Sequence, residues 1–196
     1  MSVISKVLEA VGVSYEIYRI YAQDSLPEPR SSPPNLTFKR VDGTALSLAA
    51  DRQIRALESY DRATEAFGFG AFIDGQIQSA CWYWTGKTYA QRGFWPLEAS
   101  DAKLVQIVTA NDFRGRGLAE ALVVWSSAEM ARAGFSRRYA RMWHSNKSSI
   151  RAFEKAGWRS HAFVATLSFP FIRSFLRLEK IVNGRLVVAI KKPPRE

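Results

Sequence analysis

The stretch DFRGRGLAEALVVW, residues 112 to 125, restricts the fold more than any other part of the chain. Its apolar residues from Leu118 to Trp125 recur at i, i+3, i+4 and i+7, which predicts a helix with one buried face. The β-branched run AKLVQIVTA just before it predicts a strand. The two glycines of the stretch therefore lie where a strand turns into a helix, and backbone N–H groups and the helix dipole favour a bound phosphate there.

The rest of the chain predicts an α/β domain with a mixed sheet. A strand begins at Leu36, and the segment from Thr44 to Phe67 predicts one long helix or two short ones, with Ile54, Leu57 and Ala66 among its apolar positions. The runs FGFGAFI and QIQSACWYW flank Asp74-Gly75, a strong hairpin signal. The later elements are a strand RRYARMWHS, a helix from about Asn146 and a final pair of strands around Asn183-Gly184.

Ahead of this domain, residues 1–35 are predicted to form an amphipathic helix and a connector. The apolar stripe of the helix is formed by Val3, Ile4, Val7, Leu8 and Val11. This stripe is expected to pack against the domain itself, against a second copy of the chain in a dimer, or against a membrane surface. Residues 24–35 hold four of the eight prolines, which is typical of an extended connector. The compact domain is predicted to span residues 36–196.

Composition narrows the classes of function. A chain of 196 residues supports one buried core, and its formal charge of +10 favours anionic partners. The single cysteine excludes an internal disulfide, and with only two histidines no zinc site is expected. No apolar run approaches the roughly 18 residues needed to span a bilayer, and the N-terminus lacks a cleavage site for a signal peptide. We therefore expect a cytoplasmic protein.

Three phosphate-binding motifs compete for the glycine loop. A Walker loop fails because Gly86-Lys87-Thr88 has Cys81 where the first glycine belongs. A dinucleotide-binding G-x-G-x-x-G fails because Glu120 takes the place of the third glycine. RGRGLA, Arg114 to Ala119, instead resembles the R-x-x-G-x-G/A pyrophosphate loop of the GCN5-related N-acetyltransferases (GNAT), which bind acetyl-CoA. NKSSIRAFEKAGW, Asn146 to Trp158, resembles the motif that follows it in that superfamily.

The resemblance implies a twisted, mostly antiparallel sheet with flanking helices and a V-shaped gap between two central parallel strands. In this fold, backbone of the first strand pairs with pantetheine and the loop wraps the pyrophosphate. The residues that it implies for cofactor binding are Ile107, Val108, Thr109, Arg114, Gly115, Arg116, Gly117, Leu118, Ala119, Asn146, Ser149 and Phe153. Asn146 is equally well interpreted as the N-cap of the second helix.

The implied reaction is direct transfer of the acetyl group from acetyl-CoA to an amine, without a metal. Many family members protonate the departing thiolate with a tyrosine where this chain has Phe153, so Ser149 or a water would have to serve. His144 and Asp101 are the candidate bases that deprotonate the amine. His144 is also consistent with a structural or surface role, and Asp101 with a turn beside the strand.

The acceptor is the least defined part of the prediction. Six aromatic residues crowd the strands before the glycine loop: Trp82, Tyr83, Trp84, Tyr89, Phe94 and Trp95. If some of them line a cleft, a ring-shaped acceptor such as an amino sugar or a surface-polysaccharide precursor is favoured; otherwise they are core. The alternatives are a non-catalytic acyl-CoA-binding or scaffold protein and a transferase of longer acyl groups.

Partners other than a small-molecule amine are expected to be few. Nucleic-acid binding is suggested by net charge alone and has no supporting motif. The stretch FPFIRSFLRLEK interleaves aromatics with cations and would suit peripheral contact with an anionic membrane, or a terminal sheet with basic solvent-facing positions. A monomer and a homodimer both remain consistent with the sequence.

Overall fold

The structure, a computed structural model, describes residues 14–25, 35–62, 65–90, 95–168, 175–181, 184 and 186–191. The chain divides into two compact units. The larger unit comprises Ala22–Ala140 and Ser148–Arg159, and the smaller one Met1–Tyr21, Arg141–Lys147 and Ser160–Glu196.

The larger unit is built on antiparallel strands with one parallel pair. Its strand order is β2-β3-β4-β5-β6, with β2 Leu36–Val41, β3 Ala66–Ile73, β4 Gln76–Trp84, β5 Asp101–Thr109 and β6 Arg137–Trp143, of which Arg137–Ala140 belong to this unit. Of these neighbours, β5 and β6 pair in parallel, from Asp101 opposite Arg137 to Leu104 opposite Ala140. The fold class predicted from the sequence, a mixed and mostly antiparallel sheet with flanking helices, is confirmed.

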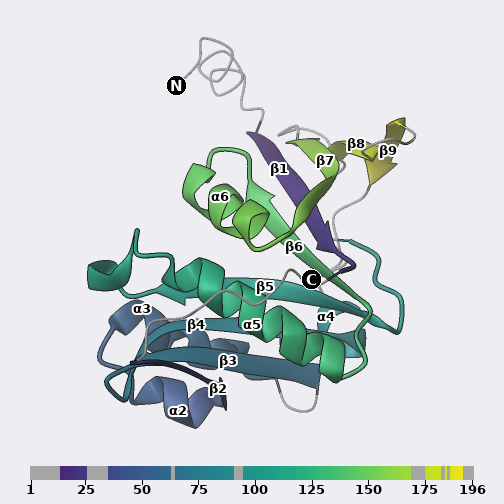
Figure 1. The fold of residues 1–196 in the computed structure, drawn as a ribbon. Helices are drawn as coiled ribbons and strands as arrows, with labels where there is room; N and C mark the ends of the chain where they lie inside the picture. The colour runs from purple at the N-terminus through teal and green to yellow at the C-terminus, as the bar shows by residue number, and fades with distance from the viewer. Residues whose placement is uncertain are drawn as a thin grey trace. The chain divides into compact units, whose positions relative to one another are not determined.

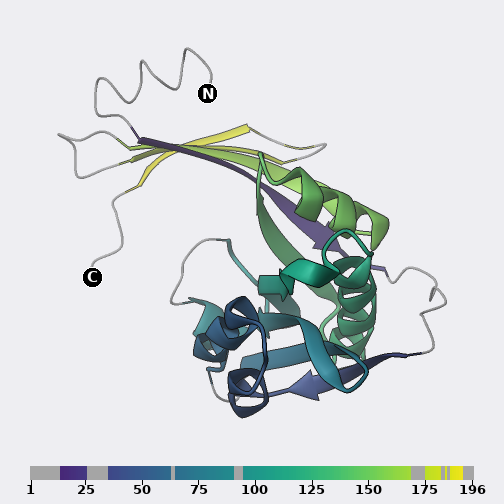
Figure 2. The ribbon, with the colours of Figure 1, turned by 90° about the vertical axis from the view of Figure 1, so that its left-hand side faces the viewer.

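Helices cover both faces of this sheet. The long helix α5, Leu118–Arg132, packs on one face against β3, β4 and β5. The opposite face carries three short helices, α2 (Gly43–Ser47), α3 (Arg52–Arg55) and the 3-10 helix η1 (Ala56–Tyr60) (Figures 1 and 2). The unit also contains α4 (Gly86–Ala90), the 3-10 helix η3 (Asn111–Phe113) and most of α6 (Lys147–Lys155).

The hairpin between β3 and β4 forms where the sequence places it. Asp74 and Gly75 both have positive φ angles, 51° and 78°, as a two-residue turn that matches the strand twist requires. Ile73 is consequently opposite Gln76, and the register continues to Ala66 opposite Trp84 with one irregularity at Ala71/Phe72. This register determines which side chains of β4 face α5 and which face the short helices.

The aromatic residues of the strands are core. Trp82, Tyr83, Trp84, Tyr89 and Trp95 are all buried, whereas Phe94 lies outside the described residues. Trp82 and Trp84 join the cluster beneath the short helices, where Leu46, Ile54 and Leu57 cover them. Burial of these five aromatics removes them as cleft-lining residues, so they give no support to a ring-shaped acceptor.

The face beneath α5 contains a small polar cluster. The Tyr83 hydroxyl lies 3.2 Å from the Ser126 hydroxyl and 3.4 Å from that of Ser127, and all three residues are buried. Burial raises the pKa of the Cys81 thiol to about 12 and raises that of Tyr83 as well. Both groups therefore stay neutral at physiological pH, and Cys81 is a structural cysteine.

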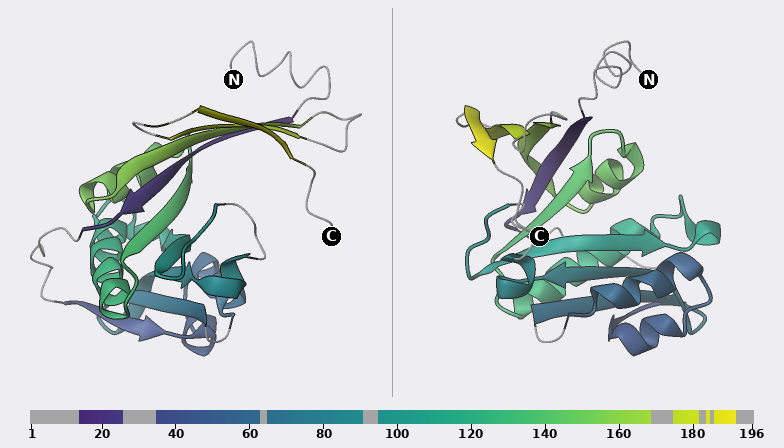
Figure 3. Two further views of the ribbon diagram at one scale, coloured as in Figure 1. Left: turned by 90° about the vertical axis from the view of Figure 1, so that its right-hand side faces the viewer. Right: turned by 180° about the vertical axis from the view of Figure 1, so that it is seen from behind.

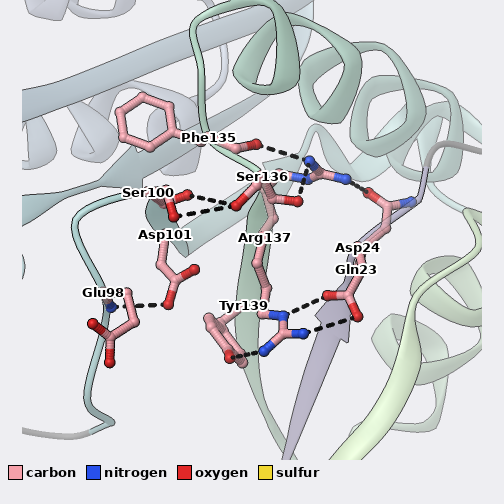
Figure 4. A network of polar contacts seen from close by, with 10 residues as sticks. Gln23, Asp24, Glu98, Ser100, Asp101, Phe135, Ser136, Arg137 and Tyr139 are labelled. Carbon is pink, nitrogen blue, oxygen red and sulfur yellow. Dashed lines mark hydrogen bonds and ion pairs between the residues drawn. The ribbon is translucent and has the colours of Figure 1, made fainter.

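A polar network fastens the end of α5 to neighbouring elements of the larger unit (Figure 4). The buried Arg138 donates to the carbonyls of Phe135 (3.0 Å) and Ser136 (3.2 Å), which close the turn between α5 and β6. Gln23 donates to the Ala156 carbonyl, just after α6, at 2.8 Å. Beside it, Arg137 pairs with Asp24 at 2.6 Å.

The smaller unit contains the remaining strands, β1 (Ser14–Gln23, of which Ser14–Tyr21 belong here), β7 (Arg159–Ser168), β8 (Phe175–Ile181) and β9 (Leu186–Lys191). They lie side by side in the order β1-β7-β8-β9 (Figure 3). β7, β8 and β9 pair antiparallel, with Ala165 opposite Leu178 and Leu178 opposite Val188.

Three expectations from the sequence need correction. Ser14–Gln23 is a strand with Tyr18, Ile20 and Tyr21 buried, so a domain beginning at residue 36 omits one of its strands. β7 was not foreseen as a separate strand. The segment from Thr44 to Phe67 ends as helix at Tyr60, and Ala66 already belongs to β3. The predicted amphipathic helix and most of the proline-rich connector lie outside the described residues.

Candidate functional site

The C-terminal half of β5 presents backbone groups away from β4. In an antiparallel pair, residues alternate between those that exchange hydrogen bonds with the partner and those whose N–H and C=O point outward. The Ala110 N–H donates to the Gln78 carbonyl at 2.8 Å, and the register places Val108 opposite Ala80. The N–H and C=O groups of Ile107 and Thr109 therefore point outward, beyond the last parallel pair of β5 with β6 at Leu104.

A β-bulge separates the two halves of β5. Gln106 is opposite Trp82, but Leu104 is opposite Tyr83, so Val105 is the extra residue. A bulge changes which backbone groups point to each side and bends the strand. In β5 it lets the first half pair with β6 while the second half directs Ile107 and Thr109 outward.

The loop after β5 has the backbone geometry of an anion-binding turn. Gly115 and Gly117 have φ angles of 74° and 78°, in the left-handed region that favours glycine. An added Cβ at either position would meet no atom within 4 Å. The conformation thus requires glycine, while the space above both residues is open to a ligand.

Backbone donors converge on this open space. The first hydrogen bond of α5 runs from the Ala121 N–H to the Gly117 carbonyl at 3.0 Å. Among the residues that the structure describes, the N–H groups from Gly115 to Ala119 have no acceptor. Free N–H groups at the start of a helix, reinforced by its dipole, form a site for phosphate.

The two arginines of the loop differ in role. Arg114 Nε donates to the Thr109 carbonyl at 3.0 Å, and its terminal nitrogen donates to Gln53 Oε1 at 2.5 Å. Arg114 therefore fastens the loop to the end of β5 and to α3. The exposed Arg116 guanidinium lies over the Phe113 ring, 5.2 Å from its centroid, and can reach a bound anion.

Asp101 lies at the other end of β5. Its Oδ2 accepts from the Glu98 N–H at 2.9 Å, and its own N–H donates to the Glu98 carbonyl at 3.0 Å (Figure 4). Thr109 is eight residues further along, roughly 26 Å on an extended strand. The buried carboxylate closes the turn that begins the strand, which supports the structural interpretation of Asp101.

His144 and Asn146 belong to the smaller unit. His144 Nδ1 lies 3.1 Å from the Ile17 carbonyl, to which the His144 backbone N–H also donates at 3.2 Å. Because a carbonyl can only accept, Nδ1 is the nitrogen that donates in this hydrogen bond, and Nε2 of the exposed residue is the nitrogen left to accept a proton in the neutral ring. Asn146 directly precedes α6, in the position of an N-cap.

Ser149 and Phe153 lie on α6, in the larger unit. Ser149 is half-buried. Phe153 is buried and packs edge-on against Trp158, with 5.0 Å between the ring centroids. Phe153 is therefore a core residue with no proton to donate, as its chemistry predicts.

Two classes of site have no support in the described part of the chain. It contains no cluster of three or more histidine, cysteine, aspartate or glutamate side chains able to hold a metal ion. None of its helices is long and apolar enough to span a bilayer. The first half of the basic, aromatic stretch considered for membrane contact, residues 169–174, lies outside the described residues.

Sequence reasoning missed one residue of this site. Gln106, in the bulge region of β5, is half-buried and its side-chain Oε1 accepts from the Ile107 N–H at 3.3 Å. A glutamine within a β-branched run has no motif to mark it. Only the strand register shows that its neighbour presents an outward N–H.

The acetyltransferase (GNAT) family model matches residues 35–158, which include the loop, β5 and α6. The chain therefore belongs to this family. No curated protein matches the sequence.

Solved structures share this fold. A GNAT acetyltransferase from Colwellia psychrerythraea has a TM-score of 0.58 at 15% identity, with 80% of this chain and 57% of that chain covered. A putative GNAT acetyltransferase from Novosphingobium aromaticivorans has a TM-score of 0.53 at 25% identity, with 80% and 66% covered. A GNAT protein from Sphaerobacter thermophilus has a TM-score of 0.56 at 16% identity, with 84% and 55% covered. The chain thus spans about half to two thirds of the length of these proteins.

Proposed function

We propose that this protein binds acetyl-CoA and transfers its acetyl group directly to the amine of a small molecule. The observation that carries the proposal is the row of free N–H groups from Gly115 to Ala119 beneath open space at the start of α5. These donors fit a pyrophosphate, and Arg116 adds a positive charge beside them. Membership of the acetyltransferase family supports the same donor.

The outward backbone of β5 suits the pantetheine arm. The Ile107 carbonyl and the Thr109 N–H flank Val108 and point the same way, so they can bond one C=O and one N–H of an extended amide chain. Arg114 occupies the neighbouring Thr109 carbonyl and thereby fixes the loop relative to this edge. The arm would run from the loop towards the bulge at Val105, which brings the thioester to the Ile107 N–H.

The amine must lose a proton before it attacks, because only the neutral amine is nucleophilic. We propose His144 as the base, since its Nδ1–H donates to the Ile17 carbonyl and leaves Nε2 to accept the proton. Asp101 is the weaker candidate because its carboxylate already closes a turn. Ser149 or a water would return a proton to the CoA thiolate, because Phe153 has none.

We expect the His144→Ala variant to lower turnover by about 100-fold while the Kd for acetyl-CoA stays unchanged, because a general base contributes to proton transfer and not to CoA binding. The turnover should be measured by thiol release between pH 6 and 9, with an amine that a screen of the wild type shows to be an acceptor. His144→Gln, which keeps a side-chain donor for the Ile17 carbonyl, is the control for a structural role. Unchanged turnover in His144→Ala, or recovery in His144→Gln, would remove the histidine from the mechanism.

The proposed donor is tested first by calorimetry on the wild-type protein. Acetyl-CoA and CoA are expected to bind with micromolar Kd. 3′-Dephospho-CoA, which lacks the 3′-phosphate but keeps the pyrophosphate, should retain most of that affinity if the pyrophosphate is the group that the loop holds. A panel of acyl-CoA chain lengths run in the same way identifies the preferred donor. If neither acetyl-CoA nor CoA binds, the loop is only a turn and the proposed function is wrong.

Phe153 favours a second candidate function. A chain that binds acyl-CoA without catalysing transfer needs the same loop and β5 edge but no proton donor on α6, and a buried phenylalanine supplies none. Thiol release in the presence of a broad amine panel distinguishes the two.

For an enzyme, the net charge of +10 favours acidic metabolites or nucleotide-linked amino sugars over polyamines as acceptors.

A further inference from the structure

The Ile107 N–H, an outward backbone donor in the second half of β5, already has an acceptor in the free protein. The acceptor is the side chain of the preceding residue, Gln106 Oε1, at 3.3 Å. The contact joins adjacent residues and is long for an N–H···O bond, so it is weak. It satisfies a donor of a half-buried residue that lies beyond the parallel pairing of β5 with β6 and points away from β4.

The Gln106 side chain can leave the Ile107 N–H without disturbing the strand. Its own backbone is in the hydrogen-bonded position opposite Trp82, so the strand does not change when the side chain rotates. Moving Oε1 away breaks one weak hydrogen bond between neutral groups. Leaving the Ile107 N–H without any acceptor would cost more free energy than that bond contributes. A ligand that brings a carbonyl oxygen to Ile107 therefore takes the place of Oε1 at little cost.

We propose that the Gln106 side chain holds the Ile107 N–H in the free protein and yields it to the thioester carbonyl of a bound acyl-CoA. This inference rests on the proposed function, in which pantetheine lies along β5. Gln106 is then a positioning residue: it acts through the Ile107 N–H and sets how strongly the protein prefers acyl-CoA to free CoA. Free CoA has no thioester carbonyl and leaves the Gln106 contact in place.

Two substitutions of Gln106 are expected to change this preference in opposite directions. Gln106→Met keeps the length of the side chain but removes the acceptor, so acetyl-CoA should bind about threefold more tightly relative to CoA. Gln106→Glu replaces a neutral acceptor with a carboxylate, which should hold the Ile107 N–H in a stronger, charge-assisted bond. Acetyl-CoA should then bind about tenfold more weakly relative to CoA.

The measurement is the ratio of Kd values for CoA and acetyl-CoA, determined by calorimetry for the wild type and both variants. The ratio does not depend on repulsion between the carboxylate introduced by Gln106→Glu and the phosphates of the ligand, because CoA and acetyl-CoA carry the same phosphates. Thermal unfolding of each variant shows that it is folded. A ratio that rises in Gln106→Met and falls in Gln106→Glu supports the inference.

Failure of the inference is distinct from failure of the proposed function. If the wild type binds both ligands but the ratio is the same in all three proteins, or moves in the same direction in both variants, Gln106 has only a structural role. If the wild type binds neither ligand, the proposed function itself is wrong and the inference falls with it.

Discussion

The Gly117→Glu variant is expected to bind acetyl-CoA at least about 100-fold more weakly than the wild type, because it removes charge-assisted contacts and adds a like charge. The space that the new Cβ would enter is open in the free protein, so the substitution fills the place of a pyrophosphate rather than displacing protein atoms. The carboxylate would also repel the pyrophosphate directly. Calorimetric titration with acetyl-CoA measures the loss.

Gly134→Glu is the matched control for this prediction. Gly134 has a φ angle of 95°, and an added Cβ there also meets no atom within 4 Å, but it follows the C-terminal end of α5. Both substitutions force a side chain into the left-handed region, at a cost of about 1–2 kcal/mol in unfolding free energy. Equal losses of affinity in the two variants would show that strain, and not the pyrophosphate site, is responsible.

The Gly68→Ala variant is expected to lose about 3 kcal/mol or more of unfolding free energy, at the upper end of the range for overpacked positions. An added Cβ would lie 2.4 Å from the Val41 carbonyl oxygen and 2.8 Å from the Trp82 ring. Val41 is the β2 residue opposite Gly68, so relief requires the two strands to separate. Urea unfolding followed by tryptophan fluorescence measures the change.

The Gly70→Ala variant, on the same strand, distinguishes a clash of the new Cβ with a backbone atom from a clash with side chains. Its added Cβ would meet side-chain atoms of Ile77, Phe72 and Val41 at 2.9, 3.0 and 3.1 Å. Side chains can rotate away more readily than a carbonyl in a paired strand. We therefore expect Gly70→Ala to lose clearly less stability than Gly68→Ala, and similar losses would contradict the argument.

Local patterns were sufficient for the elements that carry the proposed CoA site. The alternation in QIQSACWYW and the Asp74-Gly75 turn predicted a hairpin, and the i, i+3, i+4, i+7 stripe from Leu118 predicted α5. A positive-φ turn and an amphipathic helix depend on neighbouring residues alone, so sequence spacing determines them. The spacing of the two glycines likewise placed a turn between β5 and α5.

Contacts between distant residues were not visible in the sequence. β1 joins strands that follow it by more than a hundred residues, and local periodicity grouped it with the segment before it. The role of Arg114 as a brace between Thr109 and Gln53 depends on α3 lying beside the end of β5. The aromatic residues of β4 were candidates for a cleft until the packing of the short helices buried them.

Residue spacing alone was enough to predict the strand–glycine loop–helix unit, the hairpin of β3 and β4, and the family motifs from Arg114 and Asn146. Only the folded chain shows that Asp101 closes a turn, that the His144 ring bonds to the Ile17 carbonyl, and that Gln106 accepts from the Ile107 N–H. A turn or a helix follows from torsion preferences within a few residues, whereas the partner of a polar side chain depends on strand register and bulges set by the whole sheet.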